Sequence, residues 1–357
     1  MHNLQINLGE CVRVYSKASD CTKCQDICPI SAIRFDDNIP LVEDVCIDCG
    51  GCIGTCPTEA ISLKEFDTMD FIFTHLESDE HLISCKKNIP CLALLSVENL
   101  ISLALLSKET ILDLGHCATC EIRTPLQEEI QKNIQETNIF LESIQSSKRI
   151  LAEDIGYEES QQKEESNRRD FLKKFSLDGA LKSKIEFEKA IEEEEKNEVS
   201  LEDSARIRQK SIPNKRKLLF MALKKVEKPK EYHTFMHQDI SFTSQKNINA
   251  ACDNCSMCYR ICPTGALQSD RRQTKIDFDS LLCVKCALCH DVCEPDAITL
   301  APYTTRSIFE PKVEELTNFK VMRCDECANY FTYFGGEKMC PRCKVEEEEA
   351  KSLWGIQ

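Results

Sequence analysis

Short apolar segments flank a turn signal near the N-terminus. Residues 32–35 and 39–42 lie on either side of Asp36-Asp37-Asn38, three residues that favour turns. Two short apolar runs around such a triplet predict a β-hairpin.

Residues 70–152 show longer apolar segments. Residues 70–75, 81–84 and 110–114 are predicted to be short buried strands, and residues 150–152 a further one. Residues 92–106 and 126–144 carry apolar side chains at helical spacing, with Thr124-Pro125 as the start of the second helix. This alternation predicts a small parallel α/β layer.

The centre of the chain is polar. Residues 158–246 are rich in Glu, Lys, Ser and Gln, which is typical of solvated helices or linkers. Ser200 and Asp203 resemble a capping box. Residues 215–225 are amphipathic and are expected to pack on the adjoining domain, with docking on a partner as the alternative. Arg168-Arg169 resembles a twin-arginine export motif, but no apolar segment follows it, so export is not expected. A decoy that engages export chaperones is a further interpretation.

Composition indicates a folded protein with metal centres. The chain has 357 residues, 42% of them apolar, 24 cysteines and a net charge of −15, which allows two or three domains. Residues 1–14 contain no signal-peptide core, and the apolar run 91–107 is interrupted by Glu98 and Asn99, so we expect a cytoplasmic protein with no membrane span. Dense cysteine in such a protein indicates metal or redox centres rather than disulfides.

The cysteines fall into four groups, two of eight and two of four. Within the groups of eight, Cys46 to Pro57 and Cys252 to Pro263 have the spacing C-x2-C-x2-C-x3-C-P. This spacing lets three thiolates bind one four-iron cluster while the fourth binds its neighbour. Zinc knuckles are the alternative, but they would require neither the x3-C-P tail nor the Ala-Ile and Ala-Leu pairs that follow the prolines.

Crossed ligation predicts four clusters. The expected ligand sets are Cys11, Cys21, Cys24 and Cys56; Cys46, Cys49, Cys52 and Cys28; Cys252, Cys255, Cys258 and Cys293; and Cys283, Cys286, Cys289 and Cys262. The first set departs from the pattern because Ala18 stands where a ligand is expected, and Cys11 is the substitute. A three-iron centre is the alternative if Cys11 does not reach. In the last run Glu294 precedes Pro295, which leaves the ligand spacing intact.

With these motifs the chain resembles the dicluster ferredoxin family over residues 9–64 and 248–301, and more closely the polyferredoxin-type accessory proteins of bacterial respiratory oxidoreductases. The resemblance implies electron transfer through low-potential [4Fe-4S] clusters.

The two groups of four predict further centres. Cys85, Cys91, Cys117 and Cys120 should converge beyond the carboxyl ends of the parallel strands. They could bind an additional iron–sulfur cluster, bind zinc, or remain buried free thiols. This segment resembles the cysteine-bearing α/β subunit of some hydrogenase and heterodisulfide reductase complexes. Near the C-terminus, two knuckles predict one Zn²⁺, with rubredoxin-like iron as the competitor; their ligands are Cys324, Cys327, Cys340 and Cys343.

The predicted fold is an α+β multidomain chain. Its expected parts are a dicluster ferredoxin domain at 1–66, the α/β domain at 67–156, a charged and mainly helical linker at 157–246, a second dicluster ferredoxin domain at 247–303 and a zinc-ribbon-like module at 319–346.

The predicted function is electron transfer. No residues resemble a nucleophile, an acid–base pair or a phosphate loop, so an electron carrier or subunit is favoured over an enzyme. The acidic charge favours basic protein partners and disfavours nucleic acid. The expected partner is a redox protein such as a molybdenum formate dehydrogenase or nitrate reductase system. The alternatives are a maturation factor for a molybdenum oxidoreductase, and a catalytic subunit with redox chemistry at the middle cysteines.

Overall fold

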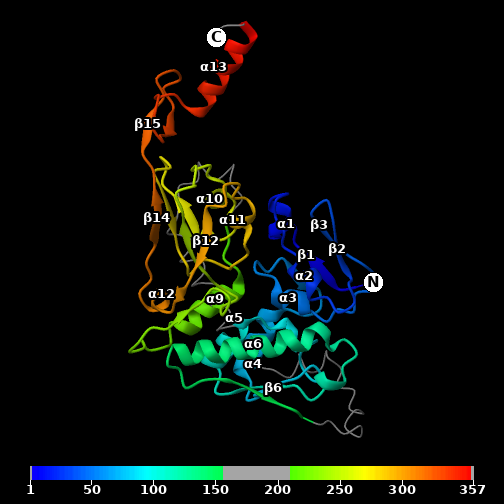
Figure 1. Cartoon of the computed structure of the whole chain (residues 1–357). Coiled ribbons are helices and arrows are strands. Elements are labelled where there is room, and N and C mark those ends of the chain that lie inside the picture. Colours follow the sequence, from blue (N-terminus) through cyan, green and yellow to red (C-terminus); the bar gives the residue numbers. More distant parts are fainter. Residues whose placement is uncertain (1, 156–209, 355–357) are drawn as a thin grey trace.

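The computed structural model describes residues 2–155 and 210–354 (Figure 1). Arg168-Arg169 and the Ser200–Asp203 capping box lie outside the described residues. In Figure 1 the N-terminal elements (blue) lie beside the elements of residues 245–301 (yellow and orange), and both lie on one side of a layer formed by residues 68–153. The C-terminal segment (red) projects from the opposite end.

The N-terminal region is built from two antiparallel strand pairs and three short helices. β1 (Leu4–Ile6) pairs with β4 (Ile61–Leu63), and β2 (Ile33–Asp36) pairs with β3 (Ile39–Val42). Between them lie α1 (Val12–Tyr15), α2 (Lys23–Asp26) and α3 (Gly51–Thr55). The predicted hairpin is confirmed; Asp37 and Asn38 turn the chain with φ of 41° and 67°, which short polar residues tolerate.

The region of residues 245–318 repeats this arrangement. β9 (Gln245–Ile248) pairs antiparallel with β12 (Ile298–Ala301), while β10 (Leu267–Ser269), β11 (Lys275–Phe278) and β14 (Glu314–Asn318) form a second sheet. The helices are α10 (Met257–Ile261) and α11 (Leu288–Asp291). The small side chain of the repeated Ala-Ile and Ala-Leu pairs is buried in every copy; these residues are Ala32, Ala60, Ala266 and Ala297.

The middle layer contains the expected parallel sheet. β5 (Leu82–Ile83), β6 (Thr110–Asp113) and β7 (Ile150–Glu153) pair in parallel in that order. They are connected by η1 (Leu92–Leu94), α5 (Val97–Leu106), η2 (Cys117–Thr119) and α6 (Arg123–Ser143). The helix predicted over residues 92–106 is divided, because the Ser96 hydroxyl and the Asn99 side chain form a capping box that starts α5 afresh.

The strand predicted at residues 70–75 is wrong. This segment lies in α4 (Thr68–Glu77), whose first turn is capped by the Asp67 carboxylate, which accepts a hydrogen bond from the Asp70 backbone N–H. Ile72 and His75 lie three residues apart on the buried face of this helix. A short apolar run does not distinguish a strand from a buried helix, and here the cap decides.

Residues 210–246 are packed into the structure. α9 (Asn214–Leu223) buries Leu218, Leu219 and Ala222 and packs chiefly against α5 of the middle layer. β8 (Thr234–Phe235) pairs with β13 (Tyr303–Thr304), which α12 (Arg306–Phe309) follows. The described part of the expected linker is therefore folded, because its apolar stretch has an apolar surface to cover.

The C-terminal segment carries β15 (Val321–Arg323), β16 (Tyr330–Thr332) and α13 (Pro341–Trp354). Its small core consists of three cysteines with Phe331 and Met339 against them. Within residues 2–155 and 210–354, no helix combines the length and apolar character needed to cross a membrane.

Candidate metal centres

All 24 cysteines lie within the described residues, and all are free thiols. In the N-terminal region they surround two cavities with apolar walls. Site 1 is lined by Cys11, Cys21, Cys24 and Cys56, and site 2 by Cys28, Cys46, Cys49 and Cys52. The structure thus brings Cys11 to the position that Ala18 leaves without a ligand, beside three thiols of the expected set.

The C-terminal repeat gathers its cysteines in the same crossed manner. Site 3 is a cavity lined by Cys252, Cys255, Cys258 and Cys293. Site 4 is the group Cys262, Cys283, Cys286 and Cys289, whose members lie close enough for their charges to raise one another's pKa. In both repeats the fourth cysteine of one run joins the first three of the other.

Backbone N–H groups donate hydrogen bonds to several of these sulfurs. The Ala32 N–H lies 3.1 Å from Cys28 Sγ, and the Ala297 N–H lies 3.2 Å from Cys293 Sγ. Cys56 Sγ accepts an equivalent bond of 3.3 Å from the N–H of Ala60. Hydrogen bonds to the charged form of a group favour that form, so these bonds support thiolates. They explain the buried alanine four positions after the cysteine.

Burial has the opposite effect on the thiols. Burial and, to a smaller extent, the neighbouring cysteines raise the pKa of Cys24 and of Cys258 to about 12. Four such thiols cannot all ionise beside one another unless a positive ion compensates their charge. Buried thiols around apolar cavities, with N–H donors aimed at sulfur, therefore fit iron–sulfur clusters.

Site 5 consists of the four middle cysteines. Cys85 follows β5, and Cys117 follows β6, so both lie beyond the carboxyl ends of parallel strands. Burial raises the pKa of Cys91 to about 12, with added contributions from Cys85 and Cys117, while Cys120 contributes to that of Cys85. Each of the four thiols is thus within electrostatic range of another member of the group.

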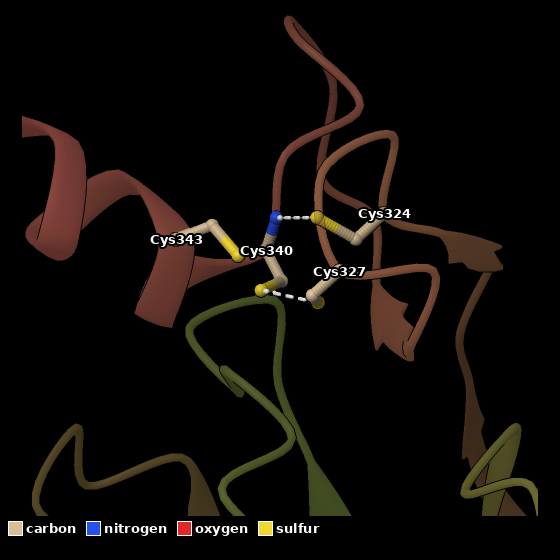
Figure 2. Close-up of side chains that lie close together, drawn as sticks. All are labelled: Cys324, Cys327, Cys340 and Cys343. Atoms are coloured by element: carbon tan, nitrogen blue, oxygen red, sulfur yellow. Dashed lines mark hydrogen bonds between the residues drawn. The ribbon is translucent and has the colours of Figure 1, made fainter.

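Site 6 is the C-terminal group, in which the four sulfurs all lie within 4.8 Å of one another. Among the described residues it is the only group of three or more Cys, His, Asp or Glu this compact. A tetrahedral zinc site with Zn–S bonds of about 2.3 Å places its sulfurs about 3.8 Å apart. Figure 2 shows Cys343 facing the other three, with Cys327 Sγ 3.7 Å from Cys340 Sγ and the Cys340 N–H donating to Cys324 Sγ at 3.3 Å. This geometry fits a single ion.

The backbone around site 6 favours the thiolate form of Cys324 before any metal binds. Hydrogen bonds from the backbone N–H groups of Cys327 and Cys340 lower the pKa of Cys324 to about 6. Hydrogen bonding with Cys340 and its neighbours raises the pKa of Cys343. A metal ion bound here would displace the protons that the four thiols still share.

Sites 5, 2 and 1 are adjacent in space. The charge of Cys49 in site 2 raises the pKa of Cys91 in site 5. The helix α3, which carries Cys52, approaches η1 so closely that a Cβ on Gly54 would lie 2.2 Å from the Ala93 carbonyl oxygen. Cys24 of site 1 in turn contributes to the raised pKa of Cys52.

The series continues into the second repeat. Cys21 of site 1 and Cys286 of site 4 pack against the same small apolar cluster, which includes Val12 and Leu288. Within the repeat, Cys289 of site 4 raises the pKa of Cys258 of site 3. The order in space is therefore site 5, site 2, site 1, site 4, site 3, so the middle cysteines of the sequence lie at one end.

Several charged residues around the sites were not identified from the sequence. The buried Lys246 Nζ lies 2.9 Å from the His290 Nε2 beside site 4. Burial and the adjacent ammonium lower the pKa of His290 to about 4. Lys285 stands between two cysteines of site 4, at the position that Asp48 occupies in site 2. Alignment of the two C-x2-C pairs in the sequence would have revealed the contrast between Asp48 and Lys285. The position of Lys246 beside site 4 follows only from the pairing of β9 with β12.

Comparison with known proteins also indicates iron–sulfur cluster domains. Residues 18–67 match the LdpA Fe-S cluster-binding domain, and residues 251–297 match the 4Fe-4S dicluster domain. No solved structure matches the chain.

Relatives match over parts of the chain. An uncharacterized ferredoxin of Methanocaldococcus jannaschii is 39% identical over 79 residues, which is 22% of this chain and 46% of that protein. The ferredoxin-type protein NapF of Haemophilus influenzae is 42% identical over 52 residues, 13% of this chain and 30% of its own length. The chain thus spans less than half of these two relatives.

Ferredoxin-2 of Chlorobaculum tepidum is covered almost completely. It is 36% identical over 56 residues, which are 14% of this chain and 90% of that ferredoxin. The chain thus matches nine tenths of the length of a ferredoxin, in agreement with the crossed arrangement of its thiols. The chain belongs to the ferredoxin-type iron–sulfur proteins.

Proposed function

We propose that this chain is an electron-transfer protein that relays electrons along sites 5, 2, 1, 4 and 3. Iron–sulfur clusters bound to such thiols accept and release single electrons. The observation that carries the proposal is the series of four contacts. Cys91 and Cys49 are within electrostatic range, as are Cys24 and Cys52, and Cys289 and Cys258. Cys21 and Cys286 pack against the same apolar cluster and link site 1 to site 4. A protein that used its clusters only for structure would not require their ligands to follow one another from one region into the next.

The ligand sets that we propose are those gathered at sites 1 to 4. Each site offers four thiols, and three of the four sites surround a cavity. The position of Cys11 in site 1 supports a four-iron rather than a three-iron cluster there. The four thiols of site 5 are not among the groups compact enough for one ion, which favours a cluster over zinc.

Iron content tests this assignment. Protein purified without oxygen is expected to contain on the order of 16 irons per chain from sites 1 to 4, and about 20 if site 5 is also loaded. Dithionite or a physiological donor should bleach the visible absorption, and a redox acceptor should restore it. An iron content near eight, or clusters that no donor reduces, would contradict the relay and favour the maturation role.

The proposed partner is a redox protein with a basic docking surface. The chain carries a net charge of −15, and its series of sites has two ends, which suits a bridge between two redox proteins. A molybdenum formate dehydrogenase or nitrate reductase system is our candidate. Capture of the partner should weaken at higher salt, because opposite surface charges would be screened.

Site 6 is proposed to hold zinc. Treatment with a zinc chelator, or the double change Cys324→Ser and Cys343→Ser, should remove about one zinc per chain and unfold residues around β15 and β16, which have too small a core to fold alone. Metal analysis and hydrogen exchange measure the two effects. Iron content should stay unchanged, and loss of iron in parallel would show that site 6 binds iron instead.

A further inference from the structure

The two repeats can be superposed by their strand pairing. Leu4 on β1 pairs with Leu63 on β4, and Lys246 on β9 pairs with Leu300 on β12. Leu63 and Leu300 stand at the same distance along the chain from the last cysteine of their repeat. Leu4 and Lys246 therefore occupy equivalent positions, and so do site 2 and site 4.

Leu4 and Lys246 give these equivalent sites different surroundings. Leu4 is buried and lines the apolar cavity of site 2. Lys246 is equally buried, at 3% exposure, and its ammonium lies against site 4 and the His290 ring. Burial alone would lower the pKa of Lys246, but the thiols of Cys283, Cys289 and Cys286 raise it above its ordinary value. The residue equivalent to His290, which directly follows the third cysteine, is the apolar Ile53.

A second pair of equivalent residues has opposite charges. Asp48 lies between Cys46 and Cys49 of site 2, and one of its oxygens lies 3.7 Å from Cys46 Sγ. Lys285 lies between Cys283 and Cys286 of site 4, where its ammonium donates to the carbonyl of Ile240 at 2.6 Å. Site 2 thus has a carboxylate where site 4 has an ammonium.

A third cation is directed at site 4. The Arg216 guanidinium, which is fully buried, donates to the Cys283 carbonyl oxygen at 3.1 Å. The charge of Arg216 is paired with the buried Glu98 carboxylate, so the cations that distinguish site 4 from site 2 are Lys246 and Lys285. Reduction adds a negative charge to a cluster, and buried positive charge stabilises that charge far more than the same charge in water would.

We propose that site 4 is more easily reduced than its equivalent, site 2, and that Lys246 and Lys285 set this difference. The proposal rests on the electron-transfer function and adds a direction to it. Electrons that enter at site 5 or site 2 are drawn across the contact between the repeats to site 4. The hydrogen bond to His290 and the carbonyl of Ile240 hold the two ammonium groups in place.

Potentiometric titration of the full iron-loaded chain, followed by EPR, tests the proposal. Lys246→Leu and Lys285→Asp copy the residues of site 2 into site 4, and Asp48→Lys makes the reverse change. Each lysine variant should lower the midpoint potential of one cluster by at least about 59 mV, which for one electron is a tenfold change in the reduction equilibrium constant. Asp48→Lys should raise the midpoint potential of a different EPR component, one whose potential is lower in the unaltered protein.

Lys275→Leu is the matched control, because the Lys275 ammonium on β11 of the same repeat pairs with Asp277 instead. The proposal is overturned if the lysine variants shift no component more than this control does, or if the component that they shift lies below the one that Asp48→Lys shifts. If the Lys246→Leu variant loses iron, the test rests on Lys285→Asp and Asp48→Lys. The Lys285 and Asp48 side chains are only partly buried, so their replacement should leave the clusters in place. Clusters that cannot be reduced at all would instead refute the electron-transfer function.

Discussion

Replacement of Arg216 by leucine is expected to lower the free energy of unfolding by about 3 kcal/mol, because the buried Glu98 carboxylate loses the nearer of its two cationic partners and keeps only Lys215, at 3.9 Å. The Arg216 and Glu98 side chains are 2% and 3% exposed, and the guanidinium Nε lies 2.5 Å from a Glu98 oxygen. The same guanidinium donates to the carbonyl oxygens of Phe242 and Cys283, so it joins α9, α5 and the second repeat. Urea denaturation of the iron-loaded chain measures the change.

Two further variants distinguish the effect of breaking the buried ion pair from the effect of removing any positive charge from α9. Lys217→Leu, on the same helix but only partly buried, should change stability by less than about 0.5 kcal/mol. The double change Arg216→Leu and Glu98→Leu should recover part of the loss, since it removes both charges of the closest pair and leaves the Lys215 ammonium bound to the Cys56 carbonyl oxygen. An Arg216→Leu variant as stable as the Lys217→Leu variant would show that the pair does not hold the regions together.

The double change Cys85→Ser and Cys117→Ser is expected to remove the centre at site 5 completely. Both thiols lie beyond the ends of parallel strands, and each is within electrostatic range of the other. Serine does not replace a thiolate ligand, and two remaining cysteines do not hold a cluster. The iron content should fall from about 20 to about 16 per chain.

The serine variant of site 6, Cys324→Ser with Cys343→Ser, is the matched control, since it should lose zinc and retain all of the iron. In the site 5 variant, EPR of the reduced protein should lose one component while the others keep their midpoint potentials. Equal iron content and an unchanged spectrum would mean that site 5 holds no iron in the native protein. In that case the relay would end at site 2.

The cysteine spacing alone determined the iron–sulfur character of this chain. Ligands of one cluster must lie within a few residues of one another or at the end of a short repeat, so C-x2-C-x2-C-x3-C-P is visible without any structure. The hairpin at Asp37 and Asn38 was equally local, because two turn residues specify it. The parallel layer followed from the alternation of segments, except at residues 70–75, where the Asp67 cap made a helix of an apolar run.

Only the tertiary structure decided the order of the sites and the charges around them. Site 5 lies between the two repeats in the sequence but at the end of the series in space, because α3 packs on η1 through the bare surface of Gly54. The packing of α9 on α5, which brings Arg216 to Glu98, depends on contacts between segments 118 residues apart. Lys246 reached site 4 through the register of β9 on β12. These contacts join segments that are far apart in the sequence. Composition and residue spacing describe only local patterns, so they do not predict such contacts.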